Sequence, residues 1–183
     1  MKSNPLERKI HRTRGVTLVE MAIVMTVGAI LASTAAPGMR GLIDTRRLEG
    51  AAAQLATDVH YGRSEAVARN QPVRLSFQAI TGGSCYVIHT GLAAQCVCGP
   101  AGAAVCSGDA VHIKTVQLAQ DNRVALQANA ASLLFDPLHG TSTPTGTLRL
   151  TGADGRAVHH VVNVMGRVRS CSPSGAMPGY RAC

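Results

Sequence analysis

The first 70 residues carry two apolar patterns, both typical of helices. Residues 16–36 form an apolar run of 21 residues with Glu20 as its single charge, and about 20 such residues can cross a bilayer as a helix. Farther along, apolar residues recur at steps of three, four and seven, which predicts a helix with one buried face, ending near Arg69. The buried face is predicted at Leu48, Ala52, Leu55, Val59 and Ala66, and the solvated faces at Arg46, Arg47, Glu49, Asp58, Arg63, Glu65 and Arg69.

Beyond Pro72, apolar and polar residues alternate as in strands with one buried face. Ala153-Asp154-Gly155-Arg156 has the Asp-Gly sequence of a tight hairpin turn, whereas the Gly-, Ala- and Cys-rich stretch 91–108 predicts no clear element. Strands are expected over 72–79, 85–88, 111–118, 123–126, 133–135, 146–150 and 157–165. The pattern therefore predicts an α+β protein: one long N-terminal helix packed on an antiparallel β-sheet head.

Three regions follow from this division. Residues 1–15 form a leader, residues 16–70 form the helix, membrane-spanning in its first half, and residues 71–183 form the β-rich head. Aromatic residues make up 3% of the chain and Trp is absent, so the core of the head must be aliphatic. The 19 glycines and 8 prolines suit a turn-rich β domain better than a helical bundle.

The leader holds half of the positive charge, with a net charge of +4 in residues 1–15 out of +8 for the chain. Basic residues before an apolar run keep the N-terminus in the cytoplasm, so the head is expected in the periplasm. An ordinary secretory signal is cut after a shorter apolar run. Here the plausible cut precedes the run, between Gly15 and Val16, and the apolar segment would remain as an inner-membrane anchor.

Glu20 is unusual because a carboxylate inside an apolar run costs about 2.5–3.5 kcal/mol on insertion scales. One explanation is a position at the depth of the lipid headgroups. The other is a positive partner, since cleavage would create an α-amino group on Val16, one helical turn away. In a helical filament the amine could belong to a neighbouring subunit. The pattern as a whole favours this second explanation, and with it a role for Glu20 in assembly.

All six cysteines lie after Gly83, and an even number confined to one exported region predicts disulfides. The alternatives are reduced thiols and a zinc site built from the first four, which lack clean C-x-x-C pairs. A bridge between the last two cysteines would fasten the chain end, and Cys96 and Cys98 are too close to pair with each other. The connectivity is otherwise open for Cys85, Cys96, Cys98, Cys106, Cys171 and Cys183.

No combination of residues suggests an active site. His159 and His160 are adjacent, so on a strand they point to opposite faces and cannot form a metal pair. The glycine-rich segments lack a phosphate-loop or dinucleotide-binding context, and nothing supports Ser-His-Asp catalysis. We therefore expect neither enzymatic activity nor a cofactor.

Gly166-Arg167-Val168-Arg169 is the strongest candidate for a binding site. On a strand, Val162, Val164 and Val168 would face the core while Arg167 and Arg169 project together into water. Paired guanidinium groups on a rigid support suit phosphate. The alternative is an ordinary charged solvent face.

The segment Gly15-Val16-Thr17-Leu18-Val19-Glu20 resembles the prepilin-peptidase site of type IV pilins and type II secretion pseudopilins. The family usually has Phe directly after the cut, where this chain has Val16. The resemblance implies cleavage after Gly15 by a prepilin peptidase and methylation of the new N-terminus. It also implies assembly with other pilin or pseudopilin subunits.

The head resembles the FimT/GspH pseudopilin family at two places. Residues 135–140, Phe-Asp-Pro-Leu-His-Gly, are similar to its F-x-P-x-G segment, and residues 166–169 are similar to its closing GRxR signature. FimT-type minor pilins are associated with DNA uptake in natural transformation, with GRxR in contact with DNA. The resemblance thus implies a DNA site at Gly166, Arg167 and Arg169. A GspH-type pseudopilin, a structural part of the type II secretion pseudopilus, is the alternative, and GRxR favours the first interpretation.

Overall fold

The computed structural model describes residues 15–183, apart from the side chains of residues 34–38, Ala101 and Ser174. Two compact units are distinguished, Met1–Arg40 and Gly41–Cys183. Helix α1 (Leu18–Arg69) contributes to both of them. The second unit contains all residues of the hydrophobic core, so we expect it to fold without the first.

The described part of the first unit is helical from Leu18 onward, and its large apolar side chains are exposed, among them Leu18, Ile23 and Leu31. No helix among the described residues is long and apolar enough to cross a membrane. The predicted membrane-spanning run 16–36 includes residues 34–36, whose side chains lie outside the described part. The membrane span therefore stays a prediction.

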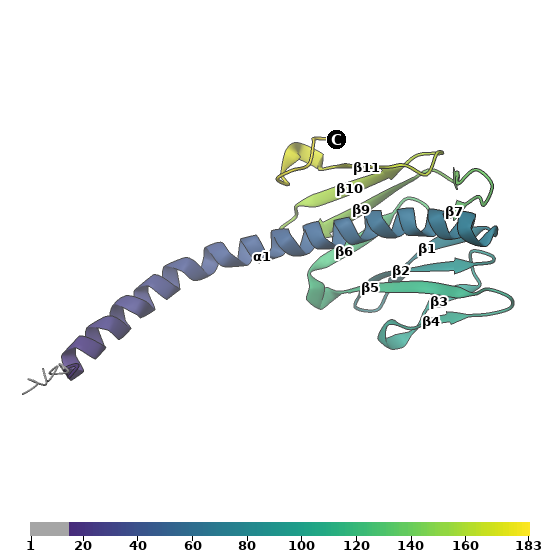
Figure 1. The fold of residues 1–183 in the computed structure, drawn as a ribbon. Coiled ribbons are helices and arrows are strands. Elements are labelled where there is room, and N and C mark those ends of the chain that lie inside the picture. Colours follow the sequence, from purple (N-terminus) through teal and green to yellow (C-terminus); the bar gives the residue numbers. More distant parts are fainter. Residues whose placement is uncertain (1–14) are drawn as a thin grey trace, which may run out of the picture. The chain divides into compact units, whose positions relative to one another are not determined.

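Antiparallel sheets build the head, as predicted (Figure 1). The first sheet has five strands and the second four, and a small two-stranded sheet lies between Cys96 and Cys106. The order of the first sheet is β5 (His112–Ala119), β2 (Gly83–Thr90), β1 (Val73–Ile80), β7 (Ser132–Phe135), β8 (Ser142–Thr143). The second is β11 (Val168–Cys171), β10 (Ala157–Val162), β9 (Gly146–Gly152), β6 (Val124–Ala128), and the small sheet pairs β3 (Cys96–Cys98) with β4 (Ala104–Cys106). Short 3-10 turns occur at η1 (Pro100–Gly102), η2 (Gln120–Asn122) and η3 (Pro173–Gly175).

The second half of α1 packs on the inner faces of both large sheets, and the predicted helical stripe is confirmed. All five of its residues, from Leu48 to Ala66, are at most 1% exposed. They meet apolar side chains from β1, β2 and β7 on one side and from β9 and β10 on the other. The core is aliphatic, as the composition required, with Tyr86 and Phe135 as its large aromatic residues.

Two strand predictions are wrong in part, and the two-residue strand β8 was not predicted. Residues 91–108, expected to form an irregular loop, contain β3 and β4, which are held together by the bridge Cys96–Cys106. Strand β10 ends at Val162 and not at Met165, because residues 163–167 form a turn. Val164 is consequently 56% exposed and does not face the core as predicted.

All six cysteines are paired, as predicted, in the bridges Cys85–Cys98, Cys96–Cys106 and Cys171–Cys183. The zinc alternative is wrong, since the four sulfurs it would need form two of these bridges. The bridge Cys85–Cys98 links β2 to β3, and the bridge Cys96–Cys106 links β3 to β4 within the small sheet. The third fastens the end of the chain to β11.

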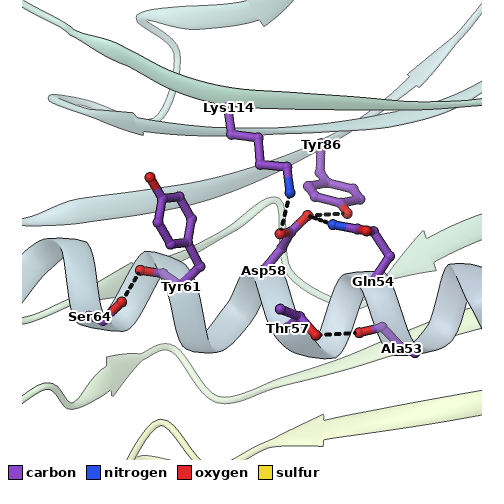
Figure 2. A network of polar contacts seen from close by, with 8 residues as sticks. All are labelled: Ala53, Gln54, Thr57, Asp58, Tyr61, Ser64, Tyr86 and Lys114. Carbon is purple, nitrogen blue, oxygen red and sulfur yellow. Dashed lines mark hydrogen bonds and ion pairs between the residues drawn. The ribbon is translucent and has the colours of Figure 1, made fainter.

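Asp58 corrects the prediction that every charged residue of the helix is solvated. Its side chain is 2% exposed and points from α1 into the first sheet (Figure 2). Lys114 Nζ lies 2.6 Å from Oδ1, and Oδ2 accepts hydrogen bonds from the Tyr86 hydroxyl at 2.7 Å and from Gln54 Nε2 at 3.0 Å. Burial and the neighbouring carboxylate both raise the pKa of Tyr86. These contacts fasten α1 to β2 and β5.

Candidate functional site

The predicted arginine site lies on the hairpin that joins β10 to β11. Gly166 occupies the turn with φ of 68°, a left-handed conformation that favours glycine. Its N–H donates to the Asn163 carbonyl at 2.9 Å, and Asn163 Oδ1 accepts from the N–H of Arg167 at 2.9 Å. The turn is therefore closed by its own backbone and by one amide side chain.

Arg63 of α1 packs against this turn, although the sequence pattern placed it on a solvated face of the helix. Its Nε donates to the carbonyl of Gly140 at 2.9 Å. A Cβ atom on Gly166 would lie 2.8 Å from the Gly140 oxygen, closer than real Cβ atoms approach backbone, and 3.1 Å from Arg63 Cδ, which is a tight contact. The Phe135–Gly140 segment and the turn around Gly166 thus both contact the Arg63 side chain. This contact joins three elements that are far apart in sequence.

Arg167 and Arg169 are both exposed, as predicted, but only Arg169 belongs to a strand. Arg169 pairs with Val161 of β10, and its neighbour Val168 pairs with the fully buried Val162. Successive residues of a strand face opposite sides, so Val168 faces the core while Arg169 faces solvent. Arg167 lies in the turn just before β11.

His160 fastens the same hairpin to α1. It is 1% exposed, and its Nε2 lies 2.9 Å from the carbonyl oxygen of Ala52 while its Nδ1 lies 2.8 Å from Ser170 Oγ. Burial lowers the pKa of His160, because an imidazolium loses its hydration there. His159 faces the other side of the sheet, so the two histidines diverge as predicted.

The tail folds back beside β11. Ser172 and Ala182 form an isolated parallel bridge, and the N–H of Ser172 donates to the carbonyl of Arg181 at 2.8 Å. The bridge Cys171–Cys183 closes this arrangement. The tail thus brings the backbone of Arg181 next to the end of β11.

Sequence reasoning missed Arg149 of β9, which is exposed on the solvent side of the second sheet. Arg149 pairs with His159 across the β9–β10 ladder. Partial burial and the positive charge of Arg149 lower the pKa of His159. The alternation of β9 was a signal that Arg149 faces solvent, but only the register places it near the hairpin.

The predicted processing site is described from Gly15 onward, whereas residues 1–14 of the leader lie outside the described part. Gly15, Val16 and Thr17 precede α1 and are exposed. Thr17 Oγ1 accepts a hydrogen bond from the N–H of Glu20 at 3.3 Å. Thr17-x-x-Glu20 has the spacing of a capping box, which satisfies free N–H groups at a helix start. Glu20 therefore also takes part in capping the start of α1, in addition to its predicted role in assembly.

Comparisons with known proteins agree with this architecture. The sequence model of the family described as type II transport protein GspH matches residues 51–166, and that of the prokaryotic N-terminal methylation motif matches residues 10–36. The type IV minor pilin FimU from Pseudomonas aeruginosa (strain PAO1) has a similar structure, with a TM-score of 0.51 and 20% identity over 74% of this chain and 95% of that chain. No curated protein matches the chain at a significant level.

The N-terminal methylation motif implies processing by a prepilin peptidase and assembly with other pilin or pseudopilin subunits. The likeness to FimU shows the fold, a helix packed on an antiparallel head. The match to the GspH family covers more than half of the chain. This protein therefore belongs to the GspH family of pilin-like filament subunits.

Proposed function

We propose that this chain is a FimT-like minor pilin that binds DNA without sequence preference for uptake in natural transformation. One observation carries the proposal. Arg167 and Arg169 are exposed, and neither has a carboxylate partner among the described residues. They stand on a hairpin that a buried histidine, a disulfide and the Gly140–Arg63 contact hold in place.

The chemistry of the hairpin favours phosphate. A guanidinium group offers donors that match phosphate oxygens in pairs, and a fixed support reduces the entropy lost on binding. A short hairpin presents no helix to the major groove, where base sequence is read. Contacts confined to phosphate position a protein on DNA without selecting a sequence.

The N-terminal region completes the proposal. A prepilin peptidase cuts between Gly15 and Val16, and the apolar helix then holds the subunit in the inner membrane with its head in the periplasm. Glu20 pairs with the new amine of Val16 on a neighbouring subunit during assembly. The protein is a structural subunit and not an enzyme, and its partners are the peptidase, other subunits, the membrane and DNA.

A second candidate is a GspH-type pseudopilin of the type II secretion pseudopilus, without a role in DNA binding. The family match is equally consistent with it, and the matched region ends at Gly166, before both arginines. This candidate shares the anchor, the fold and the processing site with the first. Only DNA binding by the head separates them.

The test is fluorescence anisotropy of a labelled, mixed-sequence duplex with the unit Gly41–Cys183, once its cooperative thermal unfolding is established. We expect a dissociation constant on the order of 10⁻⁴–10⁻⁶ M at physiological salt. Changing both Arg167 and Arg169 to Gln should remove most binding, and Lys at both positions should restore part of it. Arg47→Gln, an exposed arginine on α1, is the matched control. No binding by the unchanged head at low salt would leave the pseudopilin as the better interpretation.

A further inference from the structure

The solvent side of the second sheet carries basic residues from three strands, of which the two arginines are charged at neutral pH. Directly opposed residues in an antiparallel sheet share a face, and so do residues two apart on one strand. Arg149 of β9 opposes His159 of β10, and two residues farther along β10, Val161 opposes Arg169 of β11. Arg149, His159 and Arg169 therefore lie on one face, opposite the buried side of Leu148, Leu150 and Val162.

Arg149 is close enough to Arg169 to serve the same ligand. Strand β10 separates β9 from β11, and the two arginines differ by two residues in register. Strand spacing and rise per residue place their Cα atoms about 12 Å apart. Measured along the helix axis of a duplex, where the phosphates of one strand follow at a rise of about 3.4 Å, this distance covers roughly three to four nucleotides. Both side chains can thus reach the phosphates of one backbone at the same time.

The charges of this face are unengaged, in contrast to other cations of the head. Among the described residues, no carboxylate pairs with Arg149 or Arg169. On the first sheet, Lys114 is bound to Asp58, and Arg74 donates to Ser132 Oγ at 2.9 Å. The strands β6, β9, β10 and β11 contain neither Asp nor Glu. An anion meeting these strands encounters two arginines and no Asp or Glu side chain, although the chain end is close by, with Cys183 Sγ 3.9 Å from His159 Nδ1.

We propose that Arg149 is a third phosphate-binding residue, so that the DNA surface extends from the Arg167 turn across β11 and β10 to β9. This inference rests on the proposed DNA binding and specifies its extent. His159 lies between the two strand arginines, where its imidazole can donate to the same backbone. The surface is then a sheet face about three strands wide, and the GRVR sequence forms one end of it.

Salt dependence tests the number of contacts. Each phosphate contact adds about 0.9 to the slope of log affinity against log salt on a duplex. Arg149, Arg167 and Arg169 together predict a slope of about 2.7, equivalent to a loss of affinity of about 40-fold between 50 and 200 mM salt. For Arg149→Gln we expect a slope of about 1.8 and a loss of about 12-fold over the same range. Arg149 is exposed, so the thermal unfolding temperature of this variant should equal that of the unchanged protein.

The measurement uses anisotropy with the labelled duplex, on the unit Gly41–Cys183 and on the full mature chain in detergent. Arg47→Gln and Arg181→Gln are the matched controls, and both should keep the slope of the unchanged protein. Binding with a slope near 1.8 that Arg149→Gln leaves unchanged would overturn the inference while the proposed function stands. A slope reduced by Arg181→Gln in place of Arg149→Gln would also overturn it. Absence of all binding would instead remove the proposed function itself.

Discussion

The buried contacts of Asp58 lead to a quantitative prediction about how the helix is held on the head. Lys114→Met removes the ammonium group that lies 2.6 Å from Oδ1 and leaves the carboxylate with the donors of Tyr86 and Gln54. Hydrogen bonds to charged groups contribute about 1.5–3 kcal/mol. The Lys114 side chain is 35% exposed, so solvent screens part of this interaction. We therefore expect Lys114→Met to lower the free energy of unfolding by about 1–2 kcal/mol.

Asp58→Ala should cost more, because it also leaves the Tyr86 hydroxyl without its acceptor. Tyr86 is 1% exposed, so water cannot replace the carboxylate. An unsatisfied buried hydroxyl adds about 1–3 kcal/mol to the lost pair, which gives a total of about 3 kcal/mol. In Asp58→Ala, Lys114 has already lost its partner, so adding Lys114→Met should leave the total loss near that of Asp58→Ala alone. The coupling between the two residues is then about 1–2 kcal/mol.

Urea unfolding of the unit Gly41–Cys183, followed by circular dichroism with linear extrapolation, measures these differences. Arg47→Met is the control, since a solvent-exposed substitution on the same helix should change stability by less than about 0.5 kcal/mol. Strictly additive effects of the two single substitutions would refute the reasoning, because they would mean that Asp58 and Lys114 do not interact. A loss below about 1 kcal/mol for Asp58→Ala would show that water reaches Tyr86.

Further predictions concern processing, assembly, titration and the turn. Mass spectrometry of the membrane-extracted protein should find a chain that begins at Val16, methylated, and an intact leader would contradict the proposed cut. Glu20→Ala should reduce incorporation into filaments while the unfolding curve of the head stays the same, and normal incorporation would remove the pairing argument. Burial lowers the pKa of His89 and His160 from the usual 6.5, so below pH 6.5 the unfolded chain binds protons that the folded head does not. The contribution of these two histidines to the free energy of unfolding should therefore be fully present above about pH 6.5. It should fall on acidification by up to about 1.4 kcal/mol per pH unit for each histidine, which urea unfolding at pH 7.5 and 5.5 measures. Arg63→Met should weaken DNA binding through the loosened turn while the salt slope is retained, and an unchanged affinity would show that the turn holds its shape alone.

The parts of the fold that the sequence predicted are those encoded by local periodicity. The stripe from Leu48 to Ala66 repeats with the helical period, and its burial follows from that period alone. Most strands of the two large sheets were recognised in the same way, within a few residues of their ends, but the two-residue strand β8 was missed. The bridge Cys171–Cys183 could be anticipated because a short separation limits the partners of a chain end. The α+β class followed from these elements.

The remaining features depend on which distant residues meet, and a period carries no such information. In the helical period Asp58 falls among the charged, solvated positions. Its burial depends on Tyr86 and Lys114, which lie 28 and 56 residues away. The position of Arg149 near Arg169 depends on the order β11-β10-β9, which alternation along one strand does not fix. The end of β10 was misjudged because Val164 continues the apolar alternation into what is a turn.

The junction around Gly166 separates architecture from function in the GRVR segment. Gly166 cannot carry a side chain, because a Cβ would meet the Gly140 oxygen at 2.8 Å, and Gly140 itself is held by Arg63. This requirement concerns packing between the 135–140 loop, α1 and the hairpin, so it applies equally to a DNA-binding pilin and to a secretion pseudopilin. Arg167 and Arg169 take part in no such packing and face solvent without a carboxylate partner in the described chain. Substitution of the arginines should therefore leave the packing of the head intact, so the arginines, and not the glycine, are the residues whose substitution separates the two functions.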